Sequence, residues 1–243
     1  MHNLPLQFVP ARPCVSVVPW HTGEIRDVHV HRTTSTLDHI VPVAGLECTS
    51  VARTVIDLGR EHGRPAGVIA ADKALHEGWT TAAQLATTLA DCRRWPGLRA
   101  ARAAVECADG RAESPLESMS RLKLQDNGLP APDLQTSIGT ADGVPIARVD
   151  FYWDEFGVVG EADGMGKYDG PPVRLRTEKI RQEQLEDTGL IVVRWGWSEL
   201  STFDGVARRL LRAFARGQHR PVDDRRWSLL PTVYRPTLTP EAL

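Results

Sequence analysis

The sequence predicts an α+β protein in which an N-terminal strand-and-helix region precedes a domain built on an antiparallel sheet. Apolar residues recur at helical spacing in several segments, whereas residues 133–163 alternate as strands do and are interrupted by turn dipeptides. The 243 residues are 42% hydrophobic and 25% charged, as expected of a globular protein. We expect three parts: residues 1–110, a domain over 111–216, and a proline- and arginine-containing tail over 217–243.

The N-terminal part is predicted to form a β-hairpin followed by helices. The two strands are expected at 14–19 and 27–32, joined by the turn His21-Thr-Gly-Glu24. His29 and His31 share one face of the second strand, but two histidines without a third ligand are more often surface residues than a metal site. Glycines mark the joints between the predicted helices. These helices are expected over 50–60, 64–77, 81–90 and 96–108.

The domain over 111–216 is predicted to run helix, three antiparallel strands, helix, strand, helix. Asp142-Gly143 is a strong turn dipeptide between two strand-like segments, and Asp154-Glu-Phe-Gly157 suits a four-residue hairpin loop. The short apolar run 190–195 is typical of a buried strand. Helices are expected over 115–127, 174–187 and 198–215. The segment 223–243 contains three prolines, and we expect it to be irregular.

The second hairpin carries the most informative side chains. If Trp153 pairs with Val158, the same register sets Asp150 directly opposite Glu161. Like charges across a strand pair are destabilising, so this arrangement favours a cation between them, and a divalent ion held by hard oxygen ligands is the obvious candidate. The alternative is an ordinary solvated polar face, because alternation is the commonest strand signal.

The order of elements and the acids resemble the PD-(D/E)XK nuclease superfamily. The nearest likeness is to domains similar to very-short-patch repair endonucleases in many actinobacterial proteins, and it covers about residues 111–215. The resemblance implies a restriction-endonuclease-like core and Mg²⁺- or Mn²⁺-dependent hydrolysis of DNA phosphodiesters, in DNA repair or in defence against phages and mobile elements. It is carried by Glu113-Ser-Pro-Leu-Glu117, Ala147-Arg-Val-Asp150, Glu161-Ala-Asp-Gly164 with Lys167-Tyr168, Glu178-Lys179, and Gly189-Leu-Ile-Val-Val-Arg-Trp195.

The resemblance also implies roles for individual residues. Asp150 and Glu161 would bind the metal, with Asp163 as an additional ligand, and Glu117 would hold metal-bound water. Asp163 stands where the superfamily usually has lysine, so a cation must come from elsewhere; Lys179 is the first candidate and Lys167 the second. Glu117 also follows Ser114 by three residues in a capping-box pattern, which gives it a purely structural alternative.

A net charge of −2 gives the chain no general attraction to nucleic acid. We expect weak, sequence-independent and salt-sensitive DNA binding, through phosphate contacts from a local basic patch. The candidate patches are the stretch from Arg174 to Arg194 and the arginines at positions 208, 209, 212, 216, 220, 225 and 226. We predict that the contacts come from Arg174, Arg176, Lys179 and Arg181, and the alternative for these four is an ordinary solvated helix face.

A second resemblance favours a different function. The segment Leu46-Glu-Cys-Thr-Ser-Val-Ala-Arg-Thr-Val-Ile-Asp-Leu58 is similar to the central part of AbiEi-like antitoxins of type IV toxin–antitoxin systems, which carry a winged helix-turn-helix ahead of it. The start at Met1 resembles the middle of that architecture, so we expect the winged helix-turn-helix to be missing here, either by truncation or by loss. The alternative is therefore a non-catalytic, antitoxin-like transcriptional regulator that uses the nuclease fold as a binding module, with a toxin or a DNA-targeting protein as its partner.

Composition favours a cytoplasmic protein without membrane partners. The four cysteines form no paired C-x-x-C spacing, which suits small core residues in a reducing compartment. No apolar run reaches the length needed to span a bilayer, and residues 1–10 lack the pattern of a signal peptide.

Overall fold

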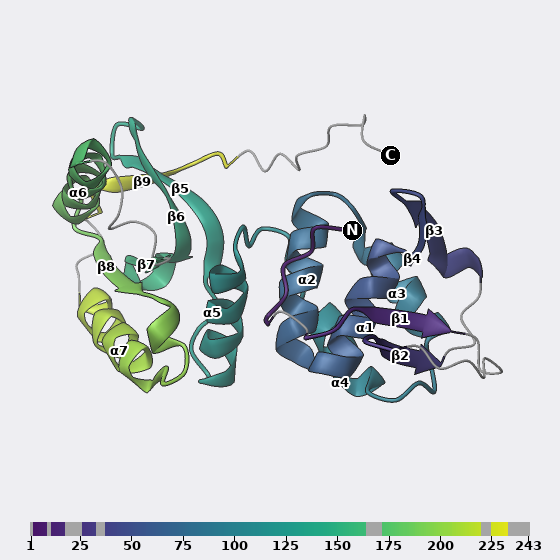
Figure 1. The fold of residues 1–243 in the computed structure, drawn as a ribbon. Coiled ribbons are helices and arrows are strands. Elements are labelled where there is room, and N and C mark those ends of the chain that lie inside the picture. Colours follow the sequence, from purple (N-terminus) through teal and green to yellow (C-terminus); the bar gives the residue numbers. More distant parts are fainter. Residues whose placement is uncertain are drawn as a thin grey trace. The chain divides into compact units, whose positions relative to one another are not determined.

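The structure is a computed structural model that describes residues 2–8, 11–17, 26–32, 37–163, 172–219 and 225–232, with the backbone alone over 172–178. Two compact units divide the chain, Met1–Ala108 and Asp109–Leu243. Helices and strands both contribute substantially, so the α+β class is confirmed (Figure 1).

Four helices form the body of the N-terminal unit: α1 (Val51–His62), α2 (Arg64–His76), α3 (Ala82–Asp91) and α4 (Leu98–Cys107). They lie within a few residues of the helices that the sequence predicts. Small residues let them approach closely, since a Cβ added at Gly67 would lie 2.6 Å from the Cβ of Ala104. The helices bury an alanine-rich core that also contains Val55 and Leu85.

The strands of this unit differ from the expectation. Strands β1 (Cys14–Val17) and β2 (His29–Arg32) pair in parallel, with Cys14 opposite His29. The predicted hairpin is therefore wrong, because a tight turn can join only antiparallel strands. The hairpin that does form is β3 (Ile40–Val43) with β4 (Leu46–Thr49). Its turn residues Ala44 and Gly45 have positive φ angles of 50° and 79°, as a primed hairpin turn requires.

A five-stranded sheet forms the centre of the C-terminal unit. The strands are β5 (Asp133–Thr140), β6 (Pro145–Trp153), β7 (Val158–Ala162), β8 (Ile191–Trp195) and β9 (Trp227–Leu230), in the spatial order β8-β7-β6-β5-β9. β8 runs parallel to β7, and the other neighbours are antiparallel. The predicted pairing of Trp153 with Val158 is confirmed. The expectation of an irregular tail is wrong for β9, which pairs with β5.

Helices cover both faces of this sheet (Figure 1). α5 (Pro115–Asp126) and α7 (Asp204–Gln218) pack on one face, in a core that contains Phe151, Val158 and Trp195. α6 (Pro172–Asp187) covers the other face, where its Leu185 joins a second core. The predicted last helix begins later than expected, because Trp197–Glu199 form a separate 3-10 turn.

Candidate functional site

Strand pairing brings two of the predicted acids together. β6 and β7 are hydrogen-bonded neighbours, and Phe151 pairs with Gly160, so Asp150 and Glu161 are the next residues along the two strands. The Asp150 carboxylate turns toward β7, and its Oδ2 accepts a hydrogen bond from the amide of Ala162 at 2.9 Å. Both acids thus lie near the end of β7, and Glu161 faces Arg181 of α6.

Two guanidinium groups neutralise the buried Glu161, which is only 2% exposed. Nη2 of Arg181, from α6, lies 2.9 Å from both carboxylate oxygens. Nη2 of Arg194, from β8, lies 2.8 Å from Oε2. The repulsion between Asp150 and Glu161 led us to expect a cation beside them. In this structure arginine side chains supply that positive charge at Glu161.

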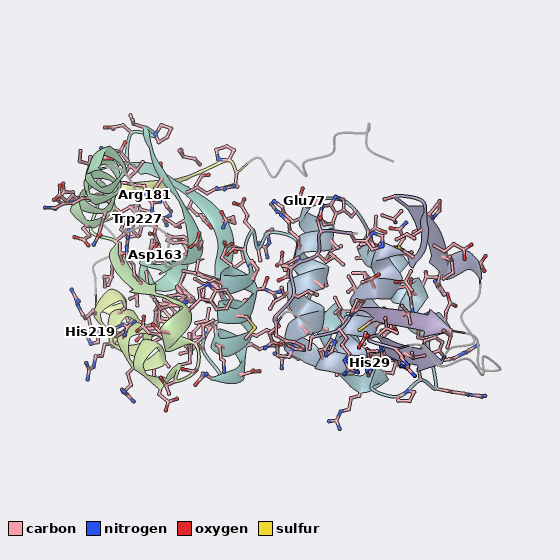
Figure 2. The ribbon with its side chains drawn as sticks, viewed as in Figure 1. His29, Glu77, Asp163, Arg181, His219 and Trp227 are labelled. Atoms are coloured by element: carbon pink, nitrogen blue, oxygen red, sulfur yellow. The ribbon has the colours of Figure 1, made fainter. Side chains whose placement is uncertain are left out.

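Asp163 extends the same ion-pair network beyond the strand. Its Oδ2 lies 3.2 Å from Nη1 of Arg194, and its amide donates to the carbonyl of Trp195 at 2.8 Å. Figure 2 shows Asp163 and Arg181 in the C-terminal unit, approaching the same region from the end of β7 and from α6. Arg194 thus bridges Glu161 and Asp163.

Glu117 takes part in the cap at the start of α5, and one of its carboxylate oxygens also contacts a residue of the sheet. Ser114 caps α5, and its hydroxyl donates to Glu117 Oε1 at 2.7 Å, while Oε2 accepts from the amide of Glu113 at 2.9 Å. The same Oε2 accepts from Nε2 of Gln135 at 2.8 Å. The capping interaction therefore holds the Glu117 carboxylate in an orientation that reaches Gln135 on the sheet.

Gln135 connects Glu117 to Asp150 of the hairpin. Its Nε2 also lies 3.3 Å from Oδ1 of Asp150. Gln135 is buried and has a φ of 53° within β5, a conformation that a residue other than glycine rarely adopts in a strand. Such backbone strain is often found at functional sites. Nothing in the sequence singles out Gln135, because its importance comes from tertiary contacts.

Lys179, the first lysine candidate, is exposed rather than placed at the acids. The side chain of Lys179 is 78% exposed, and its Nζ lies 3.7 Å from Oε1 of Glu183. It precedes Arg181 by two residues, which is roughly 200° around a helix, so the two side chains leave α6 in opposite directions. Arg181, placed in the predicted DNA-binding patch, is instead engaged by Glu161. Lys167 and the side chains of Arg174 and Arg176 lie outside the described residues.

The donor chemistry of Asp150 and Glu161 fits a hard divalent cation, since both are carboxylates on adjacent strands. In the present arrangement the arginines fill the cation's place at Glu161. Among the described residues, no three His, Cys, Asp or Glu side chains form a ready-made metal group. A metal ion at these acids would therefore have to exchange with Arg181 or Arg194.

The N-terminal unit contains a separate open cavity of about 990 Å³, lined by residues of β1, β4 and α1. Beside it, the guanidinium of Arg53 lies 4.1 Å from the ring centre of Trp95, and its Nε lies 2.8 Å from Oδ2 of Asp57. The guanidinium carbon of Arg60 lies 4.7 Å from the centre of the same ring, and its Nε donates to the carbonyl of Pro96 at 2.8 Å. This network joins α1 to the segment between α3 and α4, so we assign it a structural role.

Comparisons with known proteins give relatives without an assigned function. The uncharacterized proteins MT2308 and Rv2248 of two Mycobacterium tuberculosis strains are each 34% identical over 151 residues, which is 62% of this chain and 55% of the relative. The chain thus spans about half the length of the curated relatives it matches. No family model and no solved structure matches. Within the described residues, no helix has the length and apolar character required to cross a membrane.

Proposed function

We propose that the C-terminal unit is a DNA endonuclease of the PD-(D/E)XK type that uses Mg²⁺ or Mn²⁺. The observation that carries the proposal is a chain of contacts that relates acids from three elements: Glu117 from α5, Asp150 from β6 and Glu161 from β7. Gln135 links the first two, and main-chain pairing places the third beside them. The order of elements that suggested this superfamily, from α5 to α7, is also the order in the structure.

Each side chain would have a defined task in such a site. Asp150 and Glu161 would hold the divalent ion, which polarises the phosphoryl group and lowers the pKa of bound water. Glu117, fixed by Ser114, would position the water that attacks phosphorus. Phosphodiester hydrolysis increases negative charge on the phosphoryl oxygens, and an arginine released from Glu161 would stabilise that charge. Arg181 therefore replaces Lys179 as the preferred cationic residue. DNA as substrate would place this activity in the cytoplasm.

The antitoxin-like regulator remains the second candidate function, and one observation favours it. Both oxygens of Glu161 are engaged by guanidinium groups, so the charge of this buried acid is balanced without a metal ion. In a regulator that used the fold only for binding, Glu161 could keep these ion pairs and would need no metal ion. The two functions differ in whether Asp150 and Glu161 bind a divalent ion.

Supercoiled-plasmid cleavage tests the nuclease proposal. The wild-type protein should nick the plasmid with Mg²⁺ or Mn²⁺ and not with EDTA, and Asp150→Asn should abolish nicking. Glu186→Gln is the matched control, because Glu186 is an exposed acid of α6 whose side chain, among the described residues, accepts a hydrogen bond from Gln182. Calorimetric titration with Mn²⁺ gives a second readout. Absence of both nicking and Mn²⁺ binding in a folded wild-type protein would reject the nuclease and favour the regulator.

A further inference from the structure

A basic groove runs along one edge of the C-terminal sheet. β8 is an outer strand of the sheet as described, and α7 lies beside it. Two adjoining hollows of about 360 and 490 Å³ lie between these elements, and both include Ile191 and Arg216. We call this feature the α7–β8 groove. Its residues are Ile191, Val192, Val193, Arg194, Arg209, Arg212, Ala213, Ala215, Arg216 and His219.

The arginines of α7 form one row. Positions 209, 212 and 216 are spaced by three and four residues, so their side chains leave the helix on the same side. Arg209 donates to Glu199 and to the carbonyl of Arg194. Arg212 and Arg216 are exposed, and within the described part of the chain neither has an ion pair. The only acid of α7 is Asp204, in its first turn, so the row carries excess positive charge.

Arg194 belongs both to the groove and to the acid cluster. This residue lines the groove, and its guanidinium also contacts Glu161 and Asp163. Arg209 and Arg216 are separated by about 10 Å along the helix axis, given 1.5 Å per residue. One strand of duplex DNA carries a phosphate about every 3.4 Å along its axis, so the row spans roughly three phosphates.

We propose that the α7–β8 groove binds the phosphate backbone of duplex DNA without sequence preference and directs it to the acid cluster. The inference deepens the proposed function, because it takes DNA as the ligand. Guanidinium groups suit this ligand, since their planar donors match phosphate oxygens in pairs. The binding surface is thus α7 and the β8 edge rather than the patch on α6, where Arg181 is held by Glu161.

The salt dependence of DNA binding tests the groove. Binding of a fluorescent duplex is measured by anisotropy between 50 and 300 mM salt, with EDTA present so that no cleavage occurs. The test variant is Arg212→Gln/Arg216→Gln. The matched control is Arg99→Gln/Arg102→Gln, which removes two exposed arginines from one face of α4 and changes the net charge equally.

The groove variant should lower the log–log salt slope by about 1.8, because each phosphate contact contributes about 0.9. If the salt-independent part of binding is unchanged, affinity at 0.1 M salt should fall about 60-fold. The control should bind as the wild type does. An unchanged slope in the groove variant, or an equal loss in the control, would overturn the proposal.

Two further outcomes separate this inference from the nuclease proposal. If the groove variant loses DNA affinity while Asp150→Asn keeps it, the groove stands whether or not the wild-type protein cleaves DNA. An acidic partner protein is the competing occupant, since a peptide can extend an exposed sheet edge. If wild-type protein binds a labelled polyglutamate peptide but not the duplex, and the groove variant loses the peptide, the DNA assignment is overturned.

Discussion

Arginines of the C-terminal unit occupy two contrasting environments. At the α6 face, the Arg181 and Arg194 side chains are only 24% and 25% exposed, and both contact the buried Glu161. On α7, Arg212 and Arg216 are exposed, and the described structure gives them no acidic partner. The difference indicates that the first pair contributes to stability, whereas the second pair is available to a ligand. Four variants test or refine this contrast.

The largest effect is expected from Glu161→Gln. Loss of this charge leaves two largely buried guanidinium groups without their common partner, and breaking a buried ion pair from one side is costly. We expect the free energy of unfolding to fall by about 3 kcal/mol, measured by urea denaturation. Glu186→Gln should change it by less than about 0.5 kcal/mol. A stabilised Glu161→Gln protein would mean that charge repulsion, rather than pairing, dominates the cluster.

Arg181→Gln should have the next largest effect, on metal affinity. The substitution removes a positive charge that competes for Glu161, so Mn²⁺ should bind about tenfold more tightly. Calorimetric titration measures the change. Lys179→Gln is the control, since its ammonium lies 3.7 Å from Glu183 and is largely exposed. Weaker Mn²⁺ binding in Arg181→Gln would show that the arginine supports the site instead of competing for it.

Trp227→Phe tests how much the outer strand β9 contributes to stability through its contact with Tyr152. Nε1 of Trp227 donates to the Tyr152 hydroxyl at 2.7 Å, and that hydroxyl donates to Asp154 Oδ1 at 2.7 Å. Burial and the bond to Asp154 raise the pKa of Tyr152 above its usual value, so the hydroxyl stays protonated as a donor. Losing the indole donor should reduce stability by about 1 kcal/mol, measured by thermal unfolding. An unchanged melting temperature would indicate that β9 contributes little.

The smallest effect on stability is expected from Arg212→Gln/Arg216→Gln. Exposed side chains without ion pairs seldom contribute, so the free energy of unfolding should change by less than about 0.5 kcal/mol. The measurement is urea denaturation beside the wild type. A loss as large as that of Glu161→Gln would place these arginines in the structural class and remove the contrast between the two environments.

The sequence predicts the order of elements from α5 to α7 because local signals specify each of them. Asp142-Gly143 and the Asp154–Gly157 loop define the hairpins, and periodicity defines the helices. β9 and the parallel pairing of β1 with β2 depend on contacts between distant segments, which local patterns do not encode.

The candidate site shows the same limit at the level of single residues. Alternation and strand register place Asp150 beside Glu161 and predict that a cation must accompany them. Which cation reaches Glu161 depends on the rotational position of α6, and two residues along a helix separate Lys179 from Arg181 by more than half a turn. Gln135 is identified as part of the site only by its contacts with Glu117 and Asp150 in the structure.

The pairing of β9 with β5 has a consequence for synthesis of the protein. Ser137 on β5 lies opposite Leu230, so this edge of the sheet is covered by a segment made more than ninety residues later. While a ribosome makes the intervening chain, β5 presents unpaired amide and carbonyl groups, which are a template for intermolecular strand pairing. Nascent or truncated chains that end after α7 would therefore depend on chaperones to avoid association through this edge.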